Sequence, residues 1–533
     1  MEIKKSKLSL RSVKSAATGA ALLLAAGGVS PAQNIDNAND PANFAWQPKA
    51  LEHTARMRGF SDPDHAQQQA PTVIPQFKED RDSFGAIATL QPGGPTKTSQ
   101  NAFFADLGTN DRTCFTCHQP QNGWGVSAQH VRDRFEDSHG KDPIFRLVDG
   151  ANCPSANVTT LADKRKAYSL LLKKGLIRIG LPVPDNAEYR IVSVNDPYGC
   201  STDPVTGLTT IGLANPTVGI VSVYRRPLPS TNLGYLTAIM WDSREPSLES
   251  QSVDATLGHA QATVAPTAAQ QTQIVDFETG LFTAQSRDDK AGNLSSDGAF
   301  GGPDKLRTFL PYSYIGINDP VPNGTPPQFG NRGPNGNGNP IPFSPVIFEE
   351  YKAWANLAGD PDSEERRRRI ARGEQIFNSA PMTIARVTGI NDTLNIASFS
   401  GNCGTCHDTF NVGNHSRKLP INIGIANGSP NNDNPDLDIG DLPVFNITCV
   451  AAGPLQGKTF VVTDPGRALI SGKCVDIGKF KGPILRGLAS RAPFFHNGSG
   501  TTLETVVDFY NDRFKLNLSQ RDKADLVAFL ETL

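Results

Sequence analysis

The pentapeptide Cys114-Phe115-Thr116-Cys117-His118 occurs a second time, with the same spacing, as Cys403-Gly404-Thr405-Cys406-His407. Two cysteines three positions apart can form thioether bonds to the two vinyl groups of one porphyrin, and the following histidine can bind its iron. A zinc site would need a second Cys or His pair beside each motif, and neither motif has one. The repeated pattern therefore predicts two covalently bound haem c groups, with His118 and His407 as iron ligands.

The N-terminus has the pattern of a cleaved export signal. Five basic residues precede an Ala/Leu-rich stretch at 16–29, which ends in Ser30-Pro31-Ala32. This stretch is shorter than the roughly 18 residues needed to span a bilayer. We expect residues 1–32 to be removed as a signal peptide. The mature protein would then be periplasmic or secreted, with no membrane span.

Composition narrows the classes of partner. The formal net charge is -2 with both signs interspersed, so the sequence carries no basic footprint for nucleic acid or for an anionic membrane. The 533 residues are 38% hydrophobic, which is enough to bury ordinary cores in several domains. Small molecules and redox proteins are the expected partners.

Four cysteines remain outside the two motifs: Cys153, Cys200, Cys449 and Cys474. In an oxidising compartment these four should be bonded, and the sequence alone allows three pairings. Pairing Cys153 with Cys200 and Cys449 with Cys474 keeps each bridge within one half of the chain. We expect those two disulfides.

Pattern and composition divide the chain into five segments. The expected fold is mainly α, with two cytochrome c-type haem domains, long irregular loops and a small insertion that contains short strands. The linker is expected where Pro, Gly and Asn dominate. The segments are a signal peptide at 1–32, an extended N-terminal arm at 33–95, a first haem domain at 96–310 with an insertion at 141–216, a linker at 311–345, and a second haem domain at 346–533.

Two further stretches resemble a known family. They are MWDSR at 240–244, followed by LESQ at 248–251, and GPILRGLASRAPFFHNGS at 482–499. Both are similar to motifs of the bacterial di-haem cytochrome c peroxidase superfamily. That superfamily includes the peroxidases, a di-haem enzyme that matures the tryptophan cofactor of methylamine dehydrogenase, and the di-haem rubber oxygenases. Its branches share a fold and differ in reaction.

The resemblance implies roles for residues near the first haem. Trp241 matches the tryptophan that relays electrons between the haems, and Gln251 matches a glutamine that lines the pocket of the first haem. The family's catalytic glutamate is replaced by Gln261, an amide that cannot transfer the proton needed to cleave peroxide. His259 could serve as the base or could instead contact a haem propionate.

The resemblance also implies metal ligands. Asn215 is similar to an asparagine that binds a calcium ion together with backbone carbonyls at the positions of Arg491 and Pro493. At the second haem, the peroxidases use a methionine where this chain has Tyr510. The cofactor-maturation enzyme has tyrosine there, whereas the rubber oxygenases suggest His496 as the ligand. We favour His496, because a neutral imidazole binds ferric and ferrous iron alike.

These features predict a periplasmic di-haem oxidoreductase of the peroxidase type. It would reduce hydrogen peroxide, or use peroxide or oxygen, at the first haem with electrons relayed from the second. Its electron donor would be a small periplasmic protein. The alternatives are a di-haem oxygenase or oxidase of an organic or protein substrate, and a pure electron-transfer cytochrome in which both irons have six ligands.

Overall fold

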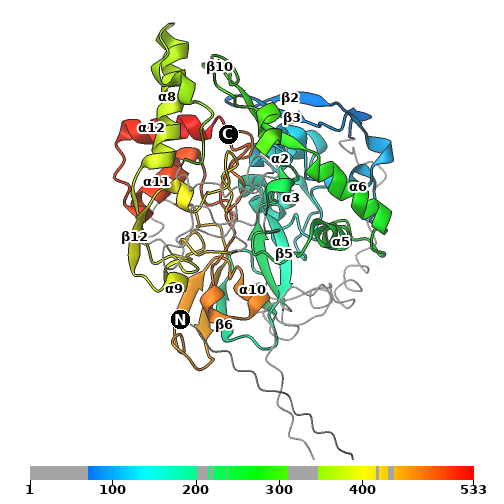
Figure 1. The fold of residues 1–533 in the computed structure, drawn as a ribbon. Helices are drawn as coiled ribbons and strands as arrows, with labels where there is room; N and C mark the ends of the chain where they lie inside the picture. Colours follow the sequence, from blue (N-terminus) through cyan, green and yellow to red (C-terminus); the bar gives the residue numbers. More distant parts are fainter. Residues whose placement is uncertain are drawn as a thin grey trace, which may run out of the picture. The chain divides into compact units, whose positions relative to one another are not determined.

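The computed structural model describes residues 70–200, 214–215, 220–236, 238–309, 346–359, 361–415, 419–429 and 437–533. All of them fall within one compact unit, Ala38–Leu533 (Figure 1). The expected signal peptide at 1–32, most of the expected arm and the expected linker at 311–345 lie outside the described residues.

The expectation of a mainly α fold is wrong. Of the residues that the structure describes, only 32% are helical and 19% are in strands, and the strands are distributed over several small sheets. The helices and strands are short, so long loops carry much of the chain. Short strands were expected in the insertion at 141–216, but sequence pattern missed those elsewhere, because many are polar and pair with segments far away along the chain, where no local periodicity reveals the partner.

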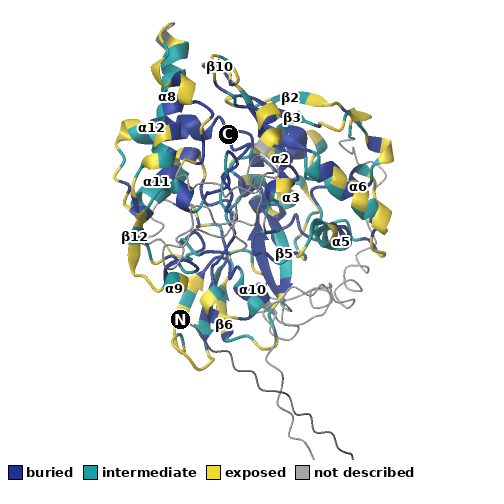
Figure 2. Cartoon of the chain, viewed as in Figure 1, coloured by how far each residue is buried: buried dark blue, intermediate teal, exposed yellow. Residues whose placement is uncertain are grey.

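The largest sheet has four antiparallel strands in the order β10-β9-β3-β2. The central strand β3 is almost fully buried, whereas β2 is exposed at alternate residues (Figure 2). Both belong to the segment expected as an extended arm. A Cβ on Gly85 would lie 2.1 Å from the carbonyl oxygen of Arg287, so only glycine allows β3 to approach β9 this closely. The strands are β2 (Phe77–Arg81), β3 (Gly85–Leu90), β9 (Phe282–Asp288) and β10 (Gly292–Asn293).

A three-stranded sheet joins the two halves of the chain. Its order is β14-β13-β6, with β6 (Tyr189–Asn195) from the first half and both β13 (Val444–Cys449) and β14 (Thr459–Val462) from the second. The other sheets are β5-β8-β7, formed by Ile177–Pro182, Ile220–Arg225 and Ala214–Asn215, and the two-stranded pairs β1-β4 (Val73–Ile74, Thr96–Lys97) and β11-β12 (Met382–Ala385, Ser398–Gly401).

Three helices surround the second motif: α8 (Pro361–Ser379), α11 (Leu503–Phe514) and α12 (Gln520–Leu530). Arginines on α8 form ion pairs, with Arg366 bound to Asp288 at 2.5 Å and Arg369 bound to Asp525 at 2.8 Å. No helix among the residues described is long and apolar enough to cross a membrane. The remaining α-helices are α2 (Ala128–Ser138), α3 (Leu161–Ala167), α4 (Ser169–Lys174), α5 (Leu248–Gly258), α6 (Ala268–Thr279), α7 (Pro303–Leu306), α9 (Asn391–Leu394) and α10 (Ala468–Ser471).

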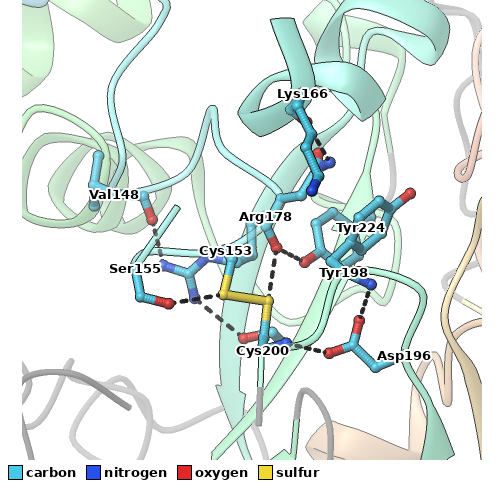
Figure 3. The surroundings of a disulfide bond; sticks show 11 residues. Val148, Cys153, Ser155, Lys166, Arg178, Asp196, Tyr198, Cys200 and Tyr224 are labelled. Atoms are coloured by element: carbon cyan, nitrogen blue, oxygen red, sulfur yellow. Dashed lines mark hydrogen bonds between the residues drawn. A yellow bond between two sulfur atoms is a disulfide. The ribbon is translucent and has the colours of Figure 1, made fainter. Parts of the chain in front are cut away.

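Both predicted disulfides are confirmed, Cys153–Cys200 and Cys449–Cys474. Figure 3 shows the first of them, with the hydroxyl of Ser155 3.1 Å from the sulfur of Cys153. The carboxylate of Asp196 accepts the backbone N–H of Cys200 at 2.8 Å. The bridge therefore ties the loop after β6 to the segment that follows the first motif.

Candidate haem sites

The first motif folds as a 3-10 turn, η5 (Cys114–Thr116), that presents its two thiols and its histidine. The Thr116 hydroxyl accepts the backbone N–H of Thr113 at 3.0 Å and closes the turn. Neither cysteine of the motif is in a disulfide, and both are partly exposed. Nδ1 of His118 lies 2.9 Å from the carbonyl oxygen of Trp124, which fixes the ring with Nε2 free. Burial lowers the pKa of His118 to about 4, so the imidazole is neutral, as an iron ligand must be.

The second motif repeats this geometry in a different part of the fold. Its turn is η11 (Cys403–Thr405), and the Thr405 hydroxyl accepts the backbone N–H of Asn402 at 3.1 Å. Nδ1 of His407 lies 2.6 Å from the carbonyl oxygen of Gly413, again six residues after the histidine. Burial lowers the pKa of His407 to about 4. Two free thiols and one oriented, neutral imidazole at each motif fit the attachment of a haem c.

The two histidines differ in what faces their free nitrogen. Tyr510, on α11, places its hydroxyl oxygen 3.5 Å from Nε2 of His407. Within the described part of the chain, no side chain makes a hydrogen bond to Nε2 of His118. Among the described residues, a side chain that could act as a second ligand therefore faces the histidine of the second motif and not that of the first.

His496, the other residue expected at the second iron, packs elsewhere. It is completely buried and its ring stacks on Phe480, with ring centroids 3.8 Å apart. Its centroid lies 6.2 Å from that of Trp241. Neither ring nitrogen has a hydrogen-bond partner among the described residues. The structure thus brings Tyr510 to His407 and His496 to Trp241.

Trp241 is buried at a point where several segments meet. Its indole N–H donates to the carbonyl of Arg226 at 2.8 Å, and its own carbonyl accepts the backbone N–H of Lys481 at 2.9 Å.

Gln251, on α5, is half-buried, and its side chain makes no hydrogen bond to another described residue.

His259 and Gln261 belong to a polar network beside the first motif. Nδ1 of His259 lies 2.7 Å from the Asp149 carboxylate, which is bound to the Arg112 guanidinium at 2.6 Å. Burial of Asp149 opposes ionisation, but Arg112 and His259 outweigh it and hold the pKa of Asp149 at about 2. The side-chain amide of Asn110 donates to the side-chain oxygen of Gln261 at 3.0 Å.

Sequence reasoning missed Asn110, Arg112 and Asp149. The first two directly precede the first motif, and that position was the only available signal for them. Asp149 lies in the predicted insertion, which offered no reason to associate it with a histidine 110 residues away.

Of the residues expected to bind calcium, Arg491 has its carbonyl oxygen in contact with a cation, which disfavours that ion. The carbonyl of Arg491 accepts a hydrogen bond of 2.7 Å from the buried guanidinium of Arg226, so a cationic group already occupies this oxygen. The side chain of Asn215 is outside what the structure describes. No cluster of three or more His, Cys, Asp or Glu side chains that could hold a metal ion occurs among the residues described.

Known proteins match parts of the chain. No family model matches it. A cytochrome-c peroxidase, IdrP2, from Denitromonas iodatirespirans is 47% identical over 78 residues, which are 13% of this chain and 21% of that protein. IdrP2 from Pseudomonas sp. (strain SCT) is 44% identical over 106 residues, 18% of this chain and 29% of that protein. This chain is related to the di-haem cytochrome c peroxidase superfamily. The resemblance of its motifs to that superfamily is confirmed.

The match to the di-haem cytochrome c peroxidase superfamily is partial, since the chain spans less than a third of the length of either relative. A solved structure, of a MauG-like protein associated with microbial copper homeostasis, is 17% identical with a TM-score of 0.30. It covers 59% of this chain and 74% of that one. A TM-score this low leaves the comparison of folds uninformative.

Covalent attachment at both motifs has a direct test in the mass of the denatured protein. Two porphyrins held by thioethers should add about 1.2 kDa to the processed polypeptide. Replacing Cys403 and Cys406 by alanine should remove half of that increment and leave the haem at the first motif. A mass equal to that of the polypeptide alone, or haem extracted by acidic butanone, would contradict attachment.

Proposed function

We propose that the protein is a periplasmic di-haem c-type oxidoreductase that reduces hydrogen peroxide at the first haem with electrons delivered through the second. The observation that carries the proposal is the inequality of the two sites, because Tyr510 faces Nε2 of His407 and no comparable side chain among the described residues faces Nε2 of His118. A bound haem supplies an iron that changes oxidation state and accepts peroxide or oxygen where an axial position is free.

At the first site, His259 would act as the general base. Asp149 contacts Nδ1 of His259, so the other ring nitrogen is left to accept a proton from peroxide. Other histidine bases that a carboxylate orients use their two ring nitrogens in the same way. Gln261 accepts from Asn110 through its side-chain oxygen, which leaves its NH₂ group to donate a hydrogen bond. We assign the base to His259 and a hydrogen-bonding role to Gln261.

Trp241 would relay electrons between the two haems. Its burial and its hydrogen bonds to the backbones of Arg226 and Lys481 hold the indole in one orientation. The electron donor in this scheme is a small periplasmic redox protein that binds through a weak interface.

Replacing Trp241 by phenylalanine should slow electron exchange between the haems while leaving both haem spectra nearly unchanged. The change removes an oxidisable ring and touches no iron ligand. Stopped-flow reduction followed at each haem would measure the exchange. Trp354→Phe is the matched control, because Trp354 is also buried and its indole N–H donates to a carbonyl, that of Ser296, at 3.0 Å. Equal rates in the wild type and the Trp241 variant would remove this residue from the relay.

Peroxide-dependent oxidation of a reduced donor by the holoprotein tests the function itself. We expect turnover with hydrogen peroxide and reduced cytochrome c.

Tyr510 and Gln261 favour a second candidate, the oxidation of an organic or protein substrate. Consumption of peroxide or oxygen without oxidation of the donor, accompanied by an oxidised organic product, would support that candidate and exclude the peroxidase.

A further inference from the structure

Three cationic residues belong to the segments around Trp241: Arg226, Lys481 and Arg491. Arg226 and Lys481 are 6% and 7% exposed, and Arg491 is half-buried. Within the described residues, no carboxylate forms an ion pair with any of them. The charge of Arg491 is close enough to act on both Arg226 and Lys481, and it repels them.

Hydrogen bonds place the backbones of Arg226 and Lys481 next to Trp241, and the guanidinium of Arg226 next to the segment that follows the first motif. The backbones of Arg226 and Lys481 bond to the indole and the carbonyl of Trp241, respectively. The guanidinium of Arg226 donates to the carbonyl of Val126 at 2.6 Å, two residues after the carbonyl that orients His118. Cδ of Arg491 lies 3.9 Å from the position that a Cβ on Gly125 would take.

No described carboxylate neutralises this cluster, although backbone carbonyl oxygens accept hydrogen bonds from the guanidinium groups of Arg226 and Arg491. A buried charge is costly unless an opposite charge and hydrogen bonds compensate for it. Arg225 shows compensation one residue away, because Asp242 and Asp464 bind its guanidinium at 2.5 and 2.7 Å. By contrast, the guanidinium of Arg226 has only carbonyl oxygens as hydrogen-bond acceptors among the described residues.

We propose that Arg226, Lys481 and Arg491 bind the propionate carboxylates of the attached haem, and that these side chains replace the calcium ion that the family resemblance implies. Carboxylates fit this site because guanidinium and ammonium groups donate strong, charge-assisted hydrogen bonds to them. A divalent cation does not fit, since it would add positive charge to three cations. The inference rests on haem attachment at the two motifs and not on peroxidase activity.

Lys481→Met tests the cluster through the reduction potentials of the haems. Loss of a positive charge beside the propionates stabilises the ferric state, so the midpoint potential of at least one haem should fall. Lys479→Met is the matched control, because Lys479 has the same 7% exposure but pairs with Asp476 at 3.0 Å. Both potentials should be unchanged in the control. Potentials equal to wild type in Lys481→Met would overturn the proposal.

The wild-type holoprotein supplies a test that does not depend on a variant's folding. Treatment with EGTA, followed by titration with calcium alone, should leave both haem spectra and both midpoint potentials unchanged. A calcium-dependent change in the spectra or potentials would overturn the proposal that the cationic side chains replace calcium. Titration with chloride or phosphate should also have no effect, and a shift would mean that the cluster binds a diffusible anion instead. Absence of haem in the mass spectrum would contradict haem attachment itself. That outcome is therefore distinguishable from a failure of the proposed propionate site.

Discussion

Tyr510→Phe is expected to convert the second haem from a low-spin to a high-spin ferric centre. The hydroxyl of Tyr510 lies 3.5 Å from Nε2 of His407, so the phenol faces the nitrogen through which His407 would bind a haem iron. Burial raises the pKa of Tyr510, so the phenol is neutral unless the iron itself displaces the proton. Loss of this anionic ligand should raise the midpoint potential by on the order of 0.1 V, a fraction of the ~0.8 V range that axial ligands span.

EPR of the ferric variant measures this conversion. Tyr189→Phe controls for the loss of a buried hydroxyl, because Tyr189 donates to the carbonyl of Ala468 at 3.0 Å away from either motif histidine. His496→Gln should retain the low-spin signal. If His496→Gln removes that signal and Tyr510→Phe preserves it, the ligand is His496 and the assignment to Tyr510 fails.

His259→Ala is expected to reduce peroxide turnover by about 10²- to 10⁴-fold, the usual contribution of a positioned general base. Asp149→Asn should cause a smaller loss, since it leaves the imidazole but removes the group that orients it. His130→Ala is the control, because His130 also lies near the first motif and bonds to Asn122 instead of to Asp149. Steady-state kinetics with a saturating donor measure the effect. Full activity in His259→Ala would assign the base to another residue.

The pH dependence of Asp149 has a definite sign. Its pKa is about 2 in the folded protein, below the value of about 3.9 expected for an unfolded chain. Asp149 therefore stabilises the fold above the unfolded value, and this contribution disappears as the pH falls through about 2. The carboxylate stays ionised across the neutral range, so loss of turnover between pH 5 and 8 would have to come from another group.

The sequence predicted the features whose signal is local. Each haem motif lies within five residues, and the disulfides followed from the number and spacing of the remaining cysteines. The pairing of β3 with β9 could not be predicted from the sequence, because the two strands are nearly 200 residues apart. The neighbouring strand β2 could not be predicted either, because it has no apolar alternation. The preference for His496 over Tyr510 relied on the resemblance of the C-terminal stretch to the rubber oxygenases and on the ability of imidazole to bind ferric and ferrous iron alike. Which residue faces His407 depends on how α11 packs, and residue type does not specify that.

EPR spectroscopy of the ferric wild-type protein tests the central claim most directly, namely that the two haem sites differ in their second axial ligand. The first site has His118 with no opposing side chain described, and the second has His407 facing Tyr510. The spectrum should therefore contain one high-spin and one low-spin centre in equal amounts, with the high-spin signal altered by peroxide or a small ligand. Two low-spin signals, both unchanged by added ligand, would contradict the account and indicate a pure electron-transfer cytochrome.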